Sequence, residues 1–437
     1  MHRTTNLTRV GNREEQDLIY YNGDIIDGKE LDEGVNSNPS ASFNETRDTA
    51  IIKDCSKYEF SIIRFQMVGS GITLPLFIPI VQPDQDDRNL TIYKIGLRVK
   101  VNYDFGGIDK TETFNIMFPI EFRSQSTTAP LPQPPLGRPQ DFSSDYYYVQ
   151  DYTHWVGLIN DTYQKLWDNI NFQFKQWWAV SGGVGTPPDL ETAVPKMMYN
   201  PDTKRFNLFT DKNGWGNTFA SKDSDTSEQW QMFFNSNMYG LFDSFPHEYE
   251  GGDLASQNET GIDGFAFEIL VIDKLGTNLY TDTSTAPASA PDPQVPPYIT
   301  YVITDQNWSS TDTLWSPIGS IVFVSSLLPI MSESTGQPIQ FGTGNNQVSG
   351  SSNGSAFQPI ITDITLGESA EAYKGKITYV PSGQYRFSSL SKSPAAIRDI
   401  DIQVFWKNRL DGNLIPLRMF NKSSISIKML FKKKAGF

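Results

Sequence analysis

Histidines, cysteines and grouped carboxylates are the side chains that most often hold metals or catalyse reactions, and this sequence gives few of them suitable partners. None of the three histidines, His2, His154 and His247, has a second ligand at the spacing of a zinc site or a C-x-x-C companion. The sequence also has no glycine-rich phosphate loop and no G-x-S-x-G motif. We therefore predict that the protein has no cofactor, no metal site and no catalytic residue, and that it is not an enzyme.

Two other groups have residue types found in ligand sites. Asp84, Asp86 and Asp87 resemble part of a calcium loop, but the glycine and distal glutamate of such a loop are missing, so an exposed acidic turn is expected. The aromatic runs at 177–178 and 146–148 have rings that could stack on sugars, although such residues more often lie in a core or an interface. A carboxylate pair for glycoside chemistry stays open, because the fold would form it.

The elements that would position these groups are mainly strands. Apolar and polar residues alternate along two C-terminal runs, as in half-buried strands. The apolar positions are Ile400, Ile402, Val404 and Trp406 in the first run and Ile425, Ile427, Met429 and Phe431 in the second. Asp411-Gly412 between them favours a tight turn, so we predict a three-strand meander closing a sheet. The last strand is too apolar for a free edge and should be paired within a sandwich or barrel.

Composition supports an all-β fold. The 437 residues are 13% aromatic and 20% charged, with 33 Gly and 27 Pro, which favours short strands joined by turns. The strand rhythm predicts a jelly-roll β-sandwich architecture, either tandem jelly rolls or one jelly roll with a large insertion. One amphipathic helix is expected near 151–170, where Trp155, Ile159, Tyr163, Leu166 and Ile170 recur at helical spacing.

Two proline-rich stretches, "STTAPLPQPPLGRPQ" and "DTSTAPASAPDPQVPP", suggest connectors between segments. We predict six segments, described here by residue range. They are an extended N-terminal arm at 1–53, a first β region at 54–128, a Pro-rich connector at 129–142, a middle segment with helix and hairpins at 143–275, a Pro-rich linker at 276–297, and a C-terminal β region at 298–437.

Charge is unevenly distributed. The formal net charge of −14 argues against a protein that wraps nucleic acid with its whole surface. Residues 396–437, however, carry nine Lys or Arg against three Asp, a net charge of +6, which leaves −20 for the remainder. This basic end, with Lys428, Lys432, Lys433 and Lys434, could face a polyanion or an acidic partner; the alternative is a solvated strand end.

Cys55 is the single cysteine, so packing rather than an intrachain disulfide must hold the fold. The N-terminal residues do not resemble a secretory signal, and no run of about 18 apolar residues occurs. We expect synthesis in the cytoplasm and no membrane span.

Four phrases resemble a known group of proteins. They are "YEFSIIRFQM…LPLFIPIVQP", "DFSSDYYYVQDYTHWVGLIND", "ITYVPSGQYRFSSL" and "IDIQVFWKNRLDGNLIPLRM". They resemble capsid proteins of polinton-like viruses, virophages and adenovirus-like DNA viruses, of the double jelly-roll or penton type. The resemblance implies a structural protein of an icosahedral capsid, located in the virion, that forms a homo-oligomer (trimer or pentamer) and contacts other capsid proteins. A receptor- or carbohydrate-binding β-sandwich, such as a fibre or adhesion module, is the alternative.

Overall fold

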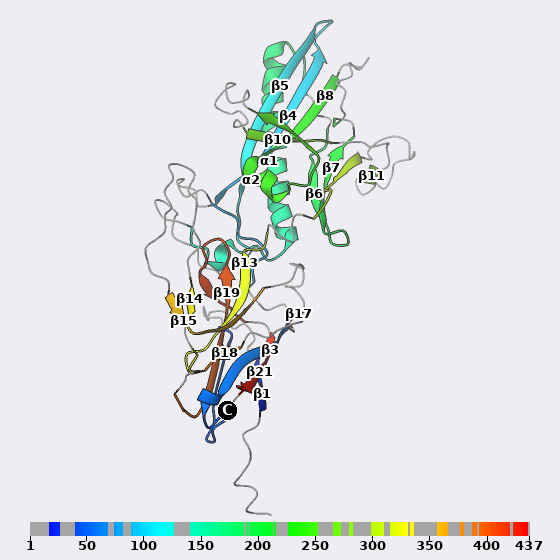
Figure 1. The fold of residues 1–437 in the computed structure, drawn as a ribbon. Coiled ribbons are helices and arrows are strands. Elements are labelled where there is room, and N and C mark those ends of the chain that lie inside the picture. Colours follow the sequence, from blue (N-terminus) through cyan, green and yellow to red (C-terminus); the bar gives the residue numbers. More distant parts are fainter. Residues whose placement is uncertain are drawn as a thin grey trace, which may run out of the picture. The chain divides into compact units, whose positions relative to one another are not determined.

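The computed structural model describes most of the chain, and the structural statements below concern that part. The described residues are 17–26, 40–68, 74–81, 89–125, 140–187, 189–190, 192–212, 214–215, 226–251, 265–271, 279–282, 299–309, 315–330, 333–335, 356–365, 376–379, 387–390, 393–419 and 423–435. They form 21 strands and two α-helices, which confirms the predicted β-dominated fold (Figure 1). The fold separates into unit 1, Met1–Pro75 with Ser316–Phe437, and unit 2, Leu76–Trp315.

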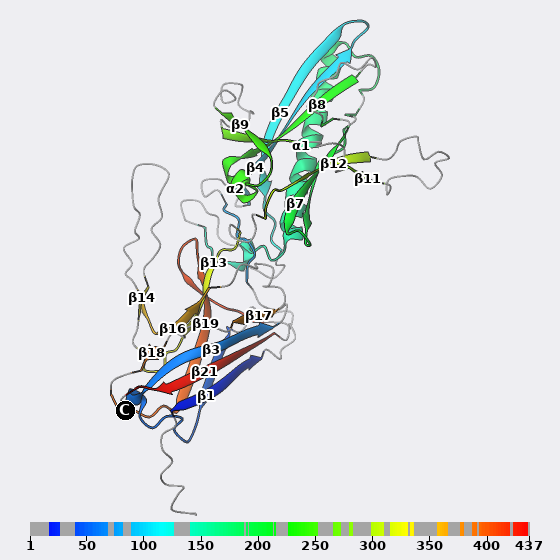
Figure 2. The same ribbon diagram turned by 45° about the vertical axis from the view of Figure 1, so that its right-hand side comes forward.

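Unit 1 contains two antiparallel sheets. The first has the order β1-β21-β3-β17, with β18 also paired to β3 (Figure 2). Its strands are β1 (Leu18–Ile26), β21 (Ser424–Lys433), β3 (Tyr58–Val68), β17 (Lys376–Tyr379) and β18 (Ser388–Ser389). β21 therefore lies between β1 and β3 and is paired along both edges, as its apolar sequence predicts.

The second sheet of unit 1 has the order β16-β13-β19-β2, with β20 also paired to β19. Its strands are β16 (Ile360–Ile364), β13 (Ile318–Val324), β19 (Asp399–Asn408), β2 (Ser42–Thr46) and β20 (Leu414–Pro416). A separate ribbon pairs β14 (Glu333–Thr335) with β15 (Ala356–Gln358), and η1 (Cys55–Lys57) precedes β3.

The inner faces of the two sheets pack together as a β-sandwich. The Phe65 and Phe323 rings, one from each sheet, lie 5.1 Å apart, and Tyr21 meets Phe43 in the same way at 6.3 Å. The eight predicted apolar positions of β19 and β21 are all buried at this core. Of the two predicted architectures, the structure has one jelly-roll sandwich with a large insertion, because both ends of the chain supply strands to it.

The predicted three-strand meander is wrong in its last strand. β20 does pair with β19, but β21 pairs with β1 and β3 in the opposite sheet. Alternation identifies a strand and its buried face, whereas it does not identify the partner strand. The partners of β21 come from residues 18–68, far away in sequence.

Unit 2 is built on a five-stranded antiparallel sheet of order β5-β4-β8-β10-β9. Its strands are β4 (Leu90–Asp104), β5 (Asp109–Glu121), β8 (Thr226–Asn235), β9 (His247–Gly251) and β10 (Phe265–Ile269). A second sheet, β11-β12-β7-β6, contains β11 (Leu279–Asp282), β12 (Ile299–Asp305), β7 (Arg205–Asp211) and β6 (Lys196–Asn200). The helices are α1 (Tyr152–Ser181), α2 (Ser236–Leu241) and the short η2 (Asp145–Tyr147).

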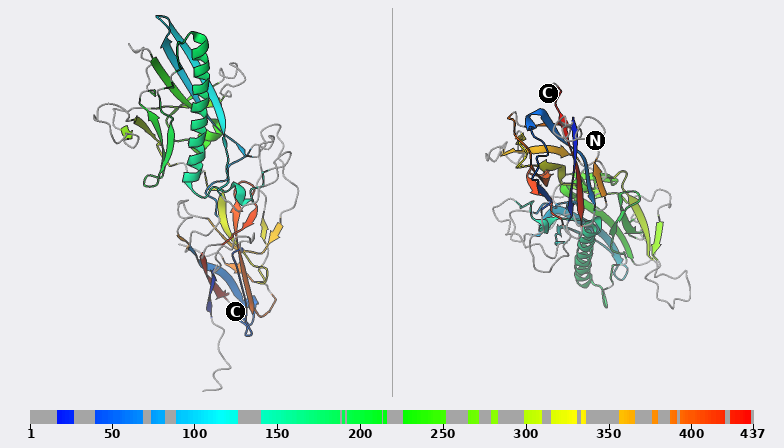
Figure 3. Two further views of the ribbon diagram at one scale, coloured as in Figure 1. Left: turned by 180° about the vertical axis from the view of Figure 1, so that it is seen from behind. Right: turned by 90° about the horizontal axis from the view of Figure 1, so that it is seen from below.

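Helix α1 runs along β4 and β5 and contacts β6 (Figure 3). It begins where Asp151 accepts a hydrogen bond from the His154 amide, and the predicted stripe from Trp155 to Ile170 is buried. The helix continues to Ser181, well beyond the predicted 151–170, because Phe174 and the two tryptophans at 177–178 pack on Tyr103 and the rings around it. Gly182 ends it in the left-handed region, at φ 99°.

The division into two units differs from the six predicted segments. The range 1–53 supplies β1 and β2 to the two sheets of the sandwich, so this part of the predicted arm is integrated in unit 1. Unit 2 takes in most of the predicted first β region and all of the middle segment. The two Pro-rich connectors lie mainly outside the described residues.

Candidate interaction surfaces

The basic end predicted from the sequence is divided between several environments. Lys428 and Lys432 are four residues apart on β21 and share the outer face of the first sheet, because strand side chains alternate. Their ammonium groups lie over the rings of Tyr20, at 5.1 Å, and Phe387, at 5.0 Å. We call this pair the basic face.

Lys433 and Lys434 do not add to the basic face in the same way. Lys433 alternates to the other side of β21, and its amide donates to the Asp17 carbonyl at 2.8 Å. The Lys434 ammonium donates to the Ser56 carbonyl in η1 at 3.0 Å. Of the four lysines of the predicted partner-facing basic end, the structure places Lys428 and Lys432 on one face of the first sheet.

A free sheet edge and three exposed apolar side chains lie next to the basic face. β1 pairs with β21 on one side, and no described strand pairs with its other side. Its outward residues Leu18, Tyr20 and Ile26 are exposed, and Ile26 is 71% exposed. A free edge with apolar side chains is well suited to contact another protein chain.

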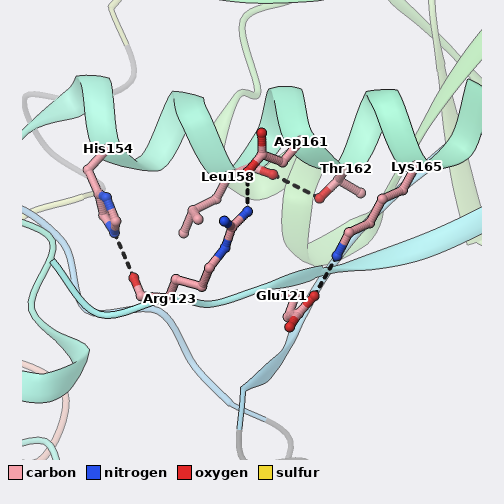
Figure 4. Close-up of polar contacts among 7 residues, drawn as sticks. All are labelled: Glu121, Arg123, His154, Leu158, Asp161, Thr162 and Lys165. Carbon is pink, nitrogen blue, oxygen red and sulfur yellow. Dashed lines mark hydrogen bonds and ion pairs between the residues drawn. The ribbon is translucent and has the colours of Figure 1, made fainter.

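Polar contacts hold α1 against the end of β5 in unit 2 (Figure 4). Lys165 donates to Glu121 at 2.5 Å, Arg123 is paired with Asp161, and the His154 ring is 2.7 Å from the Arg123 carbonyl. The charged groups are about half exposed, so each pair contributes at most about 1 kcal/mol. His154 thus has a structural hydrogen-bonding role on the surface of this helix.

His247 has a different setting, beside the Tyr239 hydroxyl at 3.0 Å and the Phe245 carbonyl at 3.1 Å. Within the described ranges no group of three or more His, Cys, Asp or Glu is arranged to hold a metal ion. Asp84, Asp86 and Asp87, for which an acidic turn was predicted, lie outside the described residues, as does His2.

The aromatic runs considered for sugar stacking are packed against the protein itself. Tyr147 and Tyr148 are buried, and Tyr146 and Tyr147 both contact the Phe122 ring. The tryptophans at 177–178 pack against Phe105. These rings therefore mainly support unit 2.

Asp401 is an important polar residue that sequence reasoning missed. The alternation in the sequence predicted that Asp401 lies on the solvent-exposed face of β19, but it is buried. Its carboxylate accepts four hydrogen bonds from the turn after β13. The donors are the Ser325 hydroxyl at 2.5 Å, the Ser326 amide at 2.9 Å and hydroxyl at 2.6 Å, and the Leu327 amide at 2.9 Å. The sequence signal was the pair Ser325-Ser326, which could have been matched to a buried carboxylate.

Burial alone would raise the pKa of Asp401, but the hydrogen bonds from Ser325, Ser326 and the turn amides outweigh it, so its pKa is lowered. The carboxylate is therefore charged at neutral pH and fixes the turn that follows β13.

A jelly-roll sandwich, an exposed sheet edge and polar residues used mainly for packing together define a structural β-protein. The family model of Sputnik minor capsid protein V18/19 matches residues 19–433, and the chain belongs to this family.

Known relatives agree. The chain is 25% identical over 243 residues to structural protein V19 of Sputnik virophage, which covers 55% of this chain and 94% of that protein. A chain of the Sputnik virophage cryo-EM structure has a TM-score of 0.67 and 22% identity, covering 96% of this chain and 99% of that one. The mavirus penton protein has a TM-score of 0.54 and 16% identity, covering 95% of this chain and 100% of that one.

Family membership confirms the resemblance seen in the sequence. The protein is a structural component of a viral capsid, is located in the virion and is not an enzyme. It assembles with other capsid proteins. Of the described helices, neither is both long and apolar enough to cross a membrane.

Proposed function

We propose that the chain is a penton-type capsid subunit that assembles with copies of itself into a closed ring. The observation that carries this proposal is the single jelly roll of unit 1, interrupted by unit 2, instead of two jelly rolls in tandem. The mavirus penton protein shares this fold along its whole length, which supports a pentamer over a trimer. Closed rotational symmetry then requires that each copy present two different, complementary surfaces to its neighbours.

The free edge of β1 supports one of these surfaces. The exposed Leu18, Tyr20 and Ile26 would be covered by the neighbouring copy, and the edge would no longer be open to uncontrolled pairing. Asn22 and Asp24 lie between these residues on the same face of β1, so the neighbouring copy would cover them too and would supply their hydrogen-bond partners.

Light scattering of the purified full chain tests the ring. We expect a species with five times the mass of one chain, and a shift toward the monomer in Ile26→Asp, because a buried charge at an interface is strongly unfavourable. The matched control is Met198→Asp, which alters an apolar side chain of unit 2 that is 54% exposed. A stable trimer or monomer, or equal behaviour of the two variants, would contradict the proposal.

The basic face also lacks a partner of known identity, and we propose that Lys428 and Lys432 contact the genome or an acidic capsid partner. The support is their shared position on the sheet surface and the +6 charge of residues 396–437 against −20 elsewhere. Two lysines that contact phosphates would make binding depend on salt.

The double variant Lys428→Gln with Lys432→Gln separates this role from a solvated strand end. If both lysines contact phosphates, the slope of log affinity for DNA against log salt should fall by about 2. The control Lys53→Gln, an exposed lysine of unit 1 outside the basic face, should keep the slope. An unchanged slope, with normal particle assembly at every ionic strength, would refute the contact.

A further inference from the structure

Unit 2 ends in a small apolar projection that the capsid role does not explain. It is formed by the turn between β4 and β5 and by the C-terminal end of α1, which lie side by side (Figure 3). Ile108 is 62% exposed, Val180 84% and Val184 93%. We call these three residues the apolar tip. Single exposed apolar residues are common, but three on one projection require a reason.

The apolar tip is held in a fixed shape. Gly182 has φ 99°, and the Gly183 amide donates to the Trp178 carbonyl at 3.1 Å, which turns the chain sharply after α1. A Cβ at Gly183 would lie 2.2 Å from the Trp178 ring, so only glycine fits there. The turn therefore directs Val180 and Val184 to the solvent through specific packing.

A second link joins the helix end to the strand turn. The Lys110 ammonium donates to the Ser181 carbonyl at 2.6 Å and lies 5.5 Å from the Phe105 ring. Phe105 packs on Trp177 and Trp178, at 5.5 and 5.0 Å. Partly buried tryptophans thus lie directly behind the aliphatic residues of the apolar tip.

We propose that the apolar tip inserts shallowly into the surface of a lipid bilayer. Aliphatic side chains in front, with tryptophan and lysine behind them, match the layers of a membrane interface, where tryptophan rings and lysine stems lie at the headgroups. The lysine stem of Lys110 and the rings at 177–178 supply this second layer.

The size and charge of the apolar tip favour this occupant over a protein. A standard protein interface takes about 20 to 30 residues from each partner, whereas the described tip offers three exposed apolar side chains on a convex turn. Its surroundings have no excess of positive charge, because Asp104 and Asp109 stand at the two ends of the turn with Lys110 beside them, and Lys175 is paired with Asp189 at 2.5 Å. A tip without excess positive charge does not need anionic lipid, so phosphatidylcholine should suffice.

Flotation of the full-length protein with vesicles of phosphatidylcholine alone tests the proposal. The unaltered chain should float with the vesicles, and Val180→Asp with Val184→Asp should lower its partition at least about tenfold, because two valines would no longer enter the lipid. The matched control is Met198→Asp, which alters an apolar side chain of unit 2 that is 54% exposed on β6. This control should float as the unaltered chain does.

The milder pair Val180→Ser with Val184→Ser should also reduce flotation, and circular dichroism melting should show that every variant folds. Failure of the unaltered chain to float, or equal flotation of the tip and control variants, overturns the proposal. The proposal is also overturned if flotation requires phosphatidylserine and is unchanged by the tip substitutions, because basic residues would then be responsible for membrane binding. A change in oligomer mass caused by the tip variants, without an effect on flotation, would make the tip a protein interface. The proposal of a closed ring is tested separately, by the light-scattering experiment described above.

Discussion

A chain truncated after Ile427 is expected to be insoluble, because residues 428–437 include the second half of β21. Met429 and Phe431 are completely buried in the sandwich, and burial of each contributes roughly 1.5 to 3 kcal/mol. The truncation also removes backbone pairing along both edges of β21, with Leu18–Asn22 of β1 on one side and with the first half of β3 on the other. Two strands would then have open edges at once.

The soluble fraction after expression and the thermal melting curve check this result. A truncation of residues 436–437 alone, which lie beyond β21, serves as the control and should keep the parent's melting temperature. A soluble chain that lacks 428–437 and melts like the parent would show that unit 1 does not depend on this strand.

The second large effect is expected for Asp401→Ala. The substitution leaves two amides and two hydroxyls of the turn at 325–327 without their acceptor, and should cost about 3 to 5 kcal/mol of the free energy of unfolding. Asp399→Ala removes a carboxylate from the same strand and is the control, expected to change the free energy by less than about 1 kcal/mol. Denaturant unfolding of both variants measures the difference, and equal losses would contradict the role assigned to Asp401.

The lowered pKa of Asp401 sets the direction of the pH effect. Its hydrogen bonds contribute full stability above the pKa of an unfolded aspartate, about 3.9, and this contribution is lost as the pH falls through the lower pKa of the folded state. Between about pH 5 and pH 3 the parent should therefore lose more stability than Asp401→Asn, which cannot be protonated at this position. Parallel curves for the two proteins would be inconsistent with a charged Asp401.

Local patterns in the sequence were sufficient to identify helices and strands in which buried residues recur with a regular period. The stripe from Trp155 to Ile170 identified α1, and the alternation around Met429 identified β21 as a doubly paired strand. The end of α1 was predicted too early because its last turns are stabilised by contacts with Tyr103 and Phe105, residues of another element. Such tertiary contacts have no periodic signal within the helix itself.

The surfaces were harder to predict for a related reason. The charge count located the basic end, but only the sheet shows that Lys428 and Lys432 share a face while Lys434 bonds to Ser56. Asp401 had the pattern of an exposed residue, and its burial depends on a turn some 75 residues earlier. The insertion of unit 2 likewise depends on pairings between strands at opposite ends of the chain.

Because β21 lies between β1 and β3, the first sheet of unit 1 can be completed only late in translation. Unit 2, from Leu76 to Trp315, emerges with all its described strands before the sandwich has most of its second sheet. β1 and β3 cannot pair with the strand between them until translation has reached Lys433. The sheet that carries the edge of β1 and the basic face is thus completed after every other described strand has been made. Until then β1 and β3 lack the strand that pairs with both, so the nascent chain has unpaired strand edges and is most prone to wrong association before β21 has been made.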